Sequence, residues 1–309
     1  MASQLTLYHH HGSFYSQKAR VAFAEKGISY KSRPVALLVL ENWEPWFVRM
    51  NPQGKLPVLD TGSEIIADSN NIIRYLDKKY PEKLLIPTDD SPTSQRVRHL
   101  HERLDSVNIP SLTYGSLNHP DMVEGSKFPG VLRSLMTDKF ADDAGINKLK
   151  RYAEENPDLR EIYEAKLVPF KEMRDSMFHR PKVEASLAHL KSVLDEVEEA
   201  LATYATEESP WLGGASFTVA DICLGLTLER MKFVGFSRQL WERGQRPQVA
   251  KYYTNVSRRP TFVAEVSSTR WQMLKFLAPV MLKRLAKPIL LTSLLGAAAA
   301  VGIWWYKTK

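Results

Sequence analysis

Two predicted helices begin at residues whose side chains could bind an anion. Ser13 stands just ahead of the segment Ser16–Lys26, whose apolar face predicts a helix. Asp68 and Ser69 precede a second helix, which ends before Pro81. A helix N-terminus carries partial positive charge, so it favours a bound anion. Helix capping as the only role of these serines is the alternative, and it stays open.

The remaining groups with metal or thiol chemistry are few. His9 and His11 would share one face of a strand, but no third ligand is fixed nearby, so we predict strand-end or loop residues and no metal site. Cys223 is the single cysteine. It therefore excludes an internal disulfide and thiolate-built zinc or iron–sulfur sites, and fits a reducing compartment. We expect it to be a small core residue.

The strands and helices that position these residues can be predicted from the spacing of apolar residues and from the positions of turn residues and prolines. Leu5 and Leu7 alternate with polar residues and predict a short strand before the first helix. Strands are predicted at Ser29–Val35, from Pro57 onward, and at Glu64–Ala67, before the second helix. The order is β-α-β followed by β-β-α. Because Pro57 cannot donate to a sheet, a cis peptide bond between Leu56 and Pro57 is natural there.

Four ordered motifs resemble those of glutathione S-transferases: Ser13–Gly27, Gly54–Leu59, Asp68-Ser69, and Ser216–Asp221. In the last motif, Thr218 and Asp221 form a helix capping box. The resemblance implies an α/β thioredoxin-like N-terminal domain (1–81) and an all-α glutathione-transferase-like C-terminal domain (92–266).

The resemblance also implies a glutathione site. The Ser13 hydroxyl would donate to the glutathione thiol and stabilise the thiolate, as the catalytic residue if the protein is active. The resemblance also implies which residues bind glutathione. Lys55 would bind the glycyl carboxylate, Leu56 with Pro57 the cysteinyl backbone, and Asp68 with Ser69 the γ-glutamyl group. Asp68 stands where the family usually has Glu, and Phe14 stands where many members have Pro. The site is therefore partly degenerate. Glutathione would be a ligand or co-substrate, and no cofactor is required.

The chain between the transferase motifs is longer than in an ordinary transferase. The excess lies within about 105–182 and contains a Pro/Gly/Asn-rich stretch, Ile109–Gly130, and a charged stretch, Gly145–Arg180. Sparse apolar residues and alternating charges predict an exposed helical insertion that binds protein partners. A solvated insertion without function is the alternative.

Composition and charge set the chain's broad class. Its 309 residues suggest two domains, and 44% apolar with 25% charged residues is the mix of a folded protein. Residues 243–309 hold twelve Lys/Arg against one acid, Glu265, within a total net charge of +7. The rest of the chain is therefore weakly acidic, which argues against nucleic-acid binding and favours an end that meets an anionic surface.

The C-terminal end predicts a membrane anchor. Residues Ile289–Tyr306 carry no charge, and as a helix they would span about 27 Å, close to the thickness of a bilayer core. Basic residues flank the span on both sides and serve as targeting residues: Lys283, Arg284, Lys287, Lys307 and Lys309. Upstream, 267–288 reads as a basic amphipathic segment on the membrane or as an ordinary packed helix. A transmembrane tail anchor (289–306) would insert after synthesis and leave the body in the cytosol.

The whole chain resembles one narrower family. The extended body, the segment Ala153–Leu159, the segment Leu228–Phe236 and the single anchor are similar to the ganglioside-induced differentiation-associated protein family. This resemblance implies a tail-anchored regulator of mitochondrial network dynamics, chiefly fission, on the outer membrane, which senses glutathione or lipophilic ligands. Peroxisomes are the second expected address. The alternative is a membrane-tethered glutathione S-transferase that conjugates hydrophobic electrophiles. A homodimer is compatible with either function.

Overall fold

The computed structural model describes residues 4–128, 133 and 143–267. The predicted span 289–306, its five basic flanking residues and nearly all of the segment 267–288 lie outside these residues. Within the described ranges, no helix has both the length and the apolar character needed to cross a membrane.

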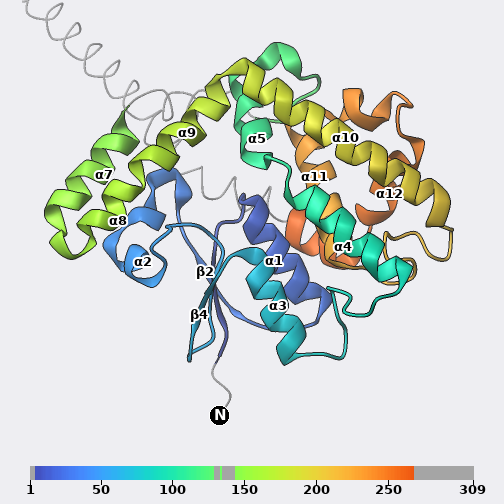
Figure 1. Cartoon of the computed structure of the whole chain (residues 1–309), viewed down its shortest axis with the longest axis horizontal. Coiled ribbons are helices and arrows are strands. Elements are labelled where there is room, and N and C mark those ends of the chain that lie inside the picture. The colour runs from blue at the N-terminus through green and yellow to red at the C-terminus, as the bar shows by residue number, and fades with distance from the viewer. Residues whose placement is uncertain (1–3, 129–132, 134–142, 268–309) are drawn as a thin grey trace, which may run out of the picture. The chain divides into compact units, whose positions relative to one another are not determined.

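The N-terminal domain is a four-stranded mixed sheet with two main helices packed against it (Figure 1). β1 (Thr6–His9) pairs parallel with β2 (Lys31–Pro34) and antiparallel with β3 (Val58–Asp60), which pairs with β4 (Ile65–Ala67). The strand order is β2-β1-β3-β4. α1 (Phe14–Glu25) and α3 (Ser69–Lys79) lie side by side. The predicted order of strands and helices is confirmed.

The core of this domain comes from the apolar positions of strands and helices. Its fully buried members include Leu7, Phe23, Leu59, Ile72, Ile73 and Leu76. Gly27 follows α1 with φ of 66°, a left-handed conformation that lets the chain turn away from the helix. Between β2 and β3 the chain forms three short helical pieces, η1 (Leu37–Val39), η2 (Glu41–Trp43) and α2 (Pro45–Met50).

The C-terminal domain is helical, as the resemblance implied. α4 (Pro92–Asp105), α5 (Ile109–Asn118), α10 (Arg180–Tyr204) and α11 (Val219–Val234) pack together. They are followed by η5 (Arg238–Glu242), α12 (Pro247–Val256), α13 (Pro260–Phe262) and η6 (Val263–Ser267). α11 is buried along most of its length because it is largely apolar.

The predicted capping box at the start of α11 is present. Asp221 Oδ2 accepts from the Thr218 backbone N–H at 2.9 Å. Asp221 also accepts from the Leu212 N–H at 2.8 Å and from the Tyr252 hydroxyl at 3.0 Å. One buried carboxylate therefore fixes the helix start, the preceding loop and α12 together.

The two domains form one compact unit through α1, which packs on α11 and α13. Arg20 on α1 forms an ion pair with Glu265, with Nη2 and Oε2 2.6 Å apart. The buried side chain of Arg20 also donates to the Glu265 carbonyl at 3.0 Å. The C-terminal end of the helical domain is thus fastened to the first helix of the chain.

The predicted insertion differs from expectation in extent. The stretch Ile109–Gly130 was expected to belong to the excess, but its first part is α5, a helix of the bundle. Leu112 and Ser111 are fully buried, and Ser111 Oγ donates to the Ser176 carbonyl at 3.0 Å. Pro, Gly and Ser are poor helix formers, but burial in the bundle outweighs that preference here.

The prediction that the charged stretch is an exposed projection is wrong. After η3 (Pro120–Met122), the described insertion consists of α7 (Ala144–Glu155), η4 (Pro157–Leu159), α8 (Arg160–Ala165) and α9 (Leu167–Phe178). α7 and α8 lie beside α2 of the N-terminal domain (Figure 1). A shared apolar cluster joins Trp43 and Val48 of that domain to Leu149, Tyr163 and Phe170.

Polar contacts reinforce this packing. The Tyr163 hydroxyl donates to the Trp43 carbonyl at 2.9 Å, and the Tyr152 hydroxyl donates to Glu44 Oε1 at 2.6 Å. An exposed ion pair between Arg49 and Asp158 adds a third link at 2.9 Å. The inserted helices therefore cover the α2 side of the N-terminal domain.

Candidate functional site

The predicted site residues come from three segments that meet at one edge of the sheet. Tyr8, at the end of β1, pairs with Val58 at the start of β3, and Val58 pairs with Ala67 at the end of β4. Ser13 follows β1, Pro57 precedes β3, and Asp68 follows β4. The sheet register therefore brings the three predicted groups to the same edge.

Ser13 is the N-cap of α1. Its hydroxyl accepts a hydrogen bond from the Ser16 N–H at 3.3 Å, and its side chain is only half-buried. Oγ keeps its own proton for donation, because capping uses the oxygen as an acceptor. Capping and thiol binding are therefore compatible roles for this residue.

The loop before Ser13 is fixed by a residue from the other domain. Arg230, on α11, donates from Nη2 to the carbonyl of Gly12 at 2.7 Å. Arg230 lies within the segment Leu228–Phe236, and no role in the site was predicted for it. No local pattern could have found the contact, because it joins residues 218 positions apart.

The second segment is the loop that leads into β3. The Leu56–Pro57 peptide bond is cis, as predicted. Two asparagine side chains hold the approach to it: Asn51 Nδ2 donates to the Lys55 carbonyl at 2.8 Å, and Asn42 Nδ2 donates to the Gly54 carbonyl at 2.7 Å. Gly54 adopts φ of 65°, and a Cβ there would lie 3.0 Å from the Asn42 carbonyl oxygen. Only glycine fits this close approach without strain.

The third segment is the N-terminus of α3. Asp68 has φ of 77°, which is rare for a residue with a side chain and occurs at functional sites. Its Oδ1 caps α3 by accepting from the Asn70 N–H at 2.8 Å and the Asn71 N–H at 3.3 Å. Asp68 is exposed and Ser69 is almost fully buried. The Asp68 carboxylate therefore remains accessible to a ligand ammonium group.

A buried polar cluster supports α3 from below. Lys18 Nζ, fully buried, donates to Asp105 Oδ1 at 2.6 Å and to Asn70 Oδ1 at 2.6 Å. Asp105 Oδ2 in turn accepts from Asn70 Nδ2 at 2.8 Å. Asn70 directly follows Ser69, so α1, α3 and α4 are joined immediately behind the predicted γ-glutamyl end of the site.

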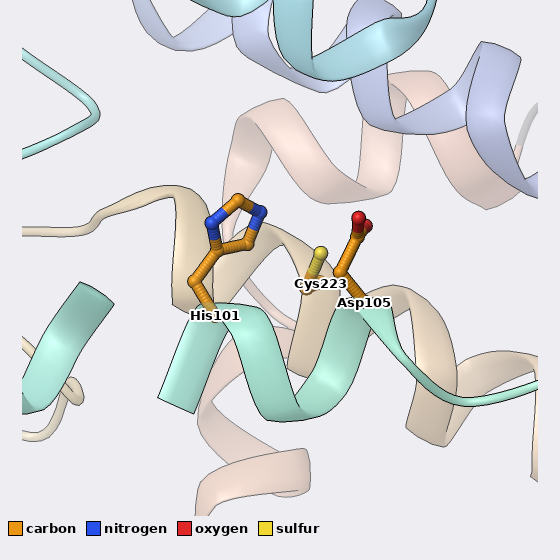
Figure 2. Close-up of side chains that lie close together, drawn as sticks. All are labelled: His101, Asp105 and Cys223. Atoms are coloured by element: carbon orange, nitrogen blue, oxygen red, sulfur yellow. The ribbon is translucent and has the colours of Figure 1, made fainter. Parts of the chain in front are cut away.

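The same cluster holds three groups that ligate metals elsewhere (Figure 2). One ligand atom each of His101, Asp105 and Cys223 lies within 4.8 Å of the others. The ammonium of Lys18 lies 3.1 Å from His101 Nε2 and bonds Asp105, so it supplies the positive charge that a metal ion would bring. These residues fit a buried ion pair better than a metal site.

Cys223 is buried, as expected for a core residue, and burial raises the pKa of its thiol. Such a thiol is not a nucleophile near neutral pH.

A cavity of about 450 Å³ lies elsewhere, on the helical domain. The charged groups along it all have partners within the protein: Arg243 pairs with Glu124 at 2.6 Å, and Arg238 pairs with the same carboxylate. The two other acidic residues of the lining, Asp121 and Glu184, both pair with Arg180. This cavity is not lined by any of the predicted site residues.

Known proteins match both domains. The family model described as glutathione S-transferase, N-terminal domain, matches residues 7–84, and the C-terminal domain model matches residues 180–255. Human ganglioside-induced differentiation-associated protein 1-like 1 is 34% identical over 269 residues, which cover 84% of this chain and 72% of that protein. Glutathione S-transferase TCHQD of Arabidopsis thaliana is 30% identical over 258 residues, covering 84% and 88%.

The fold is also found among solved structures. The beta-etherase LigF of Sphingobium sp. strain SYK-6 superposes with a TM-score of 0.62 at 18% identity, covering 86% of this chain and 99% of that one. The inserted helices α7–α9 fall between the two family-model matches. With glutathione S-transferase domains at both ends and this relative across most of its length, the chain belongs to the ganglioside-induced differentiation-associated protein family.

Proposed function

We propose that this protein binds glutathione at the edge of its N-terminal sheet and uses it to regulate mitochondrial fission from the outer membrane. The observation that carries glutathione binding is the meeting of Ser13, the cis Leu56–Pro57 edge and the Asp68–Ser69 helix start. A hydroxyl at a helix N-terminus stabilises a thiolate, and a free peptide edge pairs with a peptide ligand.

The regulatory part of the proposal is supported by the insertion and by the tail. The inserted helices pack on the α2 side of the domain that carries the site, so ligand binding and the position of the insertion can influence each other. The uncharged segment Ile289–Tyr306 with basic flanks is typical of a tail anchor. Family membership is the reason to expect the mitochondrial outer membrane.

The alternative function is a membrane-tethered transferase that conjugates hydrophobic electrophiles. The half-buried hydroxyl of Ser13 favours it, and one relative carries the name glutathione S-transferase. The decisive experiment measures glutathione binding and conjugation by the full chain in detergent, with Ser13→Ala as the test. Ser91→Ala is the matched control, because Ser91 caps α4 in the same way, from Ser94 N–H at 3.2 Å.

We expect glutathione to bind the native chain, and Ser13→Ala to raise the pKa of the bound thiol while Ser91→Ala leaves it unchanged. If the native chain conjugated glutathione rapidly and Ser13→Ala abolished this activity, the transferase function would be favoured over the regulatory one. A native chain that binds no glutathione would contradict both functions.

The membrane part has its own test. A reporter fused to residues 270–309 should reach mitochondria, and neutral residues at Lys307 and Lys309 should divert part of it to other membranes. Deleting Ile289–Lys309 from the full chain should release it into the soluble fraction and change the shape of the mitochondrial network. A deleted chain that stays on mitochondria would overturn the anchor.

A further inference from the structure

One lysine of the insertion reaches the predicted glutathione site. Lys166 lies between α8 and α9, and its ammonium donates to the carbonyl of Pro52, in the loop that leads to the cis peptide. The same Nζ would lie 3.5 Å from a Cβ placed on Gly54. The insertion therefore places a positive charge beside the segment Pro52–Gly54, which directly precedes Lys55 and Leu56, across 114 residues of sequence.

This ammonium also lies within the influence of the charge of Lys55, an exposed residue one position after Gly54. Lys166 is half-buried, and the pKa of its side chain is lowered to about 8 by burial and by the charge of Lys55. Two neighbouring ammonium groups repel each other, so such a pair is favourable only when an anion offsets the charge.

Two lysines that are more deeply buried than Lys166 have such an anion within the protein. Lys18 pairs with Asp105 at 2.6 Å, and Lys26 pairs with Asp77 at 2.8 Å. In the part of the chain that the structure describes, neither Lys55 nor Lys166 forms an ion pair with a carboxylate; Lys166 donates to a neutral carbonyl. The pair retains unused donors, because an ammonium group has three.

The position of the pair identifies the anion. Lys55 immediately precedes Leu56, whose backbone is the predicted partner of the cysteinyl residue of glutathione. Asp68 and Ser69, at the start of α3, take the γ-glutamyl end. The pair is therefore adjacent to the glycyl end of a bound glutathione, which carries a free carboxylate.

We propose that Lys166 joins Lys55 in binding the glycyl carboxylate, so that the inserted helices form part of the ligand site and select γ-glutamyl peptides with a free C-terminal carboxylate. This inference rests on the proposed glutathione binding. The competing role for Lys166 is purely structural, as a tie between the insertion and the Pro52 carbonyl.

The test compares two ligands on the full chain in detergent: S-methylglutathione, which has no titrating thiol, and its glycyl ethyl ester, which lacks the carboxylate charge. Dissociation constants are measured at pH 7 for the native chain, Lys166→Met and Lys166→Arg. Lys171→Met is the matched control, because Lys171 is an exposed lysine on α9, the helix that begins directly after Lys166.

We expect Lys166→Met to weaken S-methylglutathione about tenfold, as the loss of one charge-assisted hydrogen bond does, and to leave the ester unchanged. Lys166→Arg should restore most of the affinity, and Lys171→Met should have no effect. Raising the pH from 7 to 8.5 should weaken S-methylglutathione in the native chain more than in Lys166→Met, because Lys166 loses its proton over that range.

Each other outcome contradicts the inference in a distinct way. Equal weakening of both ligands in Lys166→Met would make Lys166 a structural tie. Unchanged binding of both would remove it from the site while leaving the proposed glutathione binding intact. If the native chain bound neither ligand, the proposed function would fall, and this inference with it.

Discussion

The side chain of Glu25 joins α1 to two distant segments of the chain. Its carboxylate, at the end of α1, accepts from Arg259 Nε at 2.6 Å and from Lys83 Nζ at 2.8 Å, and from the hydroxyl of Thr261. Burial alone would raise the pKa of Glu25, but these hydrogen bonds outweigh it and lower the pKa to about 2. The ionised form is therefore strongly favoured in the folded protein.

Replacing Glu25 by Gln should destabilise the protein by about 3 kcal/mol at pH 7, because two cations lose their partner. A carboxylate with a lowered pKa stabilises fully above its ordinary value of 4.5, and the contribution is lost as the pH falls toward 2. Urea unfolding at pH 7 and at pH 3.5 measures both effects. The gap between native and variant should narrow in acid. Glu161→Gln, an exposed change on α8, is the control, and a similar loss there would refute the assignment.

At the scale of single residues, the sequence could predict what lies in local motifs. Ser13 and Asp68 are helix caps, and the peptide bond before Pro57 is cis, as their neighbours in the sequence indicate. Lys166 and Arg230 could not be predicted. Each reaches the site from more than 100 residues away, so only the folded chain brings them there.

The insertion is the element where sequence reasoning failed most clearly, although the signal was present. Ile146, Leu149 and Ala153 recur at helical spacing on α7, and all three are buried. The charged residues between them suggested that the helix is exposed. The sequence could not show that a distant segment, Trp43–Val48, covers these three apolar side chains. A narrow apolar stripe indicates a partner, and here that partner is the chain's own first domain.

Leu149→Ala should therefore destabilise the chain by about 3 kcal/mol, the usual cost of truncating a fully buried leucine. It should also make the insertion sensitive to limited proteolysis before the rest of the chain unfolds. Val168→Ala on α9 is the control, since that side chain is 62% exposed. Equal sensitivity of both variants to protease would mean that the packing in the shared cluster is unimportant.

The capping box of α11 was predictable from its motif, but its reach was not. Asp221→Ala should cost about 3 kcal/mol, because it leaves the buried N–H groups of Leu212 and Thr218 without these acceptors. It also removes the shorter of the two hydrogen bonds that the Tyr252 hydroxyl donates. Tyr252→Phe, which removes one of these donors, should cost about 1 kcal/mol. Chemical unfolding of the two variants provides the comparison. If Asp221→Ala lowered the free energy of unfolding no more than Tyr252→Phe does, Asp221 would not hold the loop, the helix start and α12 together.

Over the whole molecule, three histidines make stability depend on pH. Burial, and then the charge of Arg20, lower the pKa of His9 to about 3 and of His11 to about 4. Burial, and then the charge of Lys18, lower the pKa of His101 to about 4. All three are neutral in the folded protein at pH 7.

The unfolded chain therefore takes up protons first as the pH falls. The contribution of these histidines is complete above pH 6.5. It is lost progressively as the pH falls from 6.5 to about 4 for His11 and His101, and to about 3 for His9. The melting temperature should drop by several degrees between pH 7 and pH 5, before the carboxylates titrate. His101→Gln should flatten this slope, whereas His99→Gln, at an exposed position, should not. If the melting temperature depended on pH identically in His101→Gln and in the native chain, buried His101 would not be a source of the pH dependence.

The overall architecture was predictable because the motifs of both domains are local and ordered. The thioredoxin-like sheet and the helical bundle follow from strand and helix periods, caps and turns. The site at the sheet edge follows from the strand order. The fission role, the outer-membrane address and a homodimer stay predictions, since they depend on what the chain meets outside itself.

The fastening of the helical domain's end to α1 decides where the chain can be cut for laboratory work. Arg259 and Thr261 bond Glu25, and Glu265 pairs with Arg20, so the last turn that the structure describes belongs to the body. A fragment that stops at residue 258 would leave the buried Arg20 without Glu265, and Glu25 with Lys83 as its one remaining cation. Ending the fragment after Ser267 keeps every one of these bonds, which makes that version the natural first product for crystallisation and ligand screening.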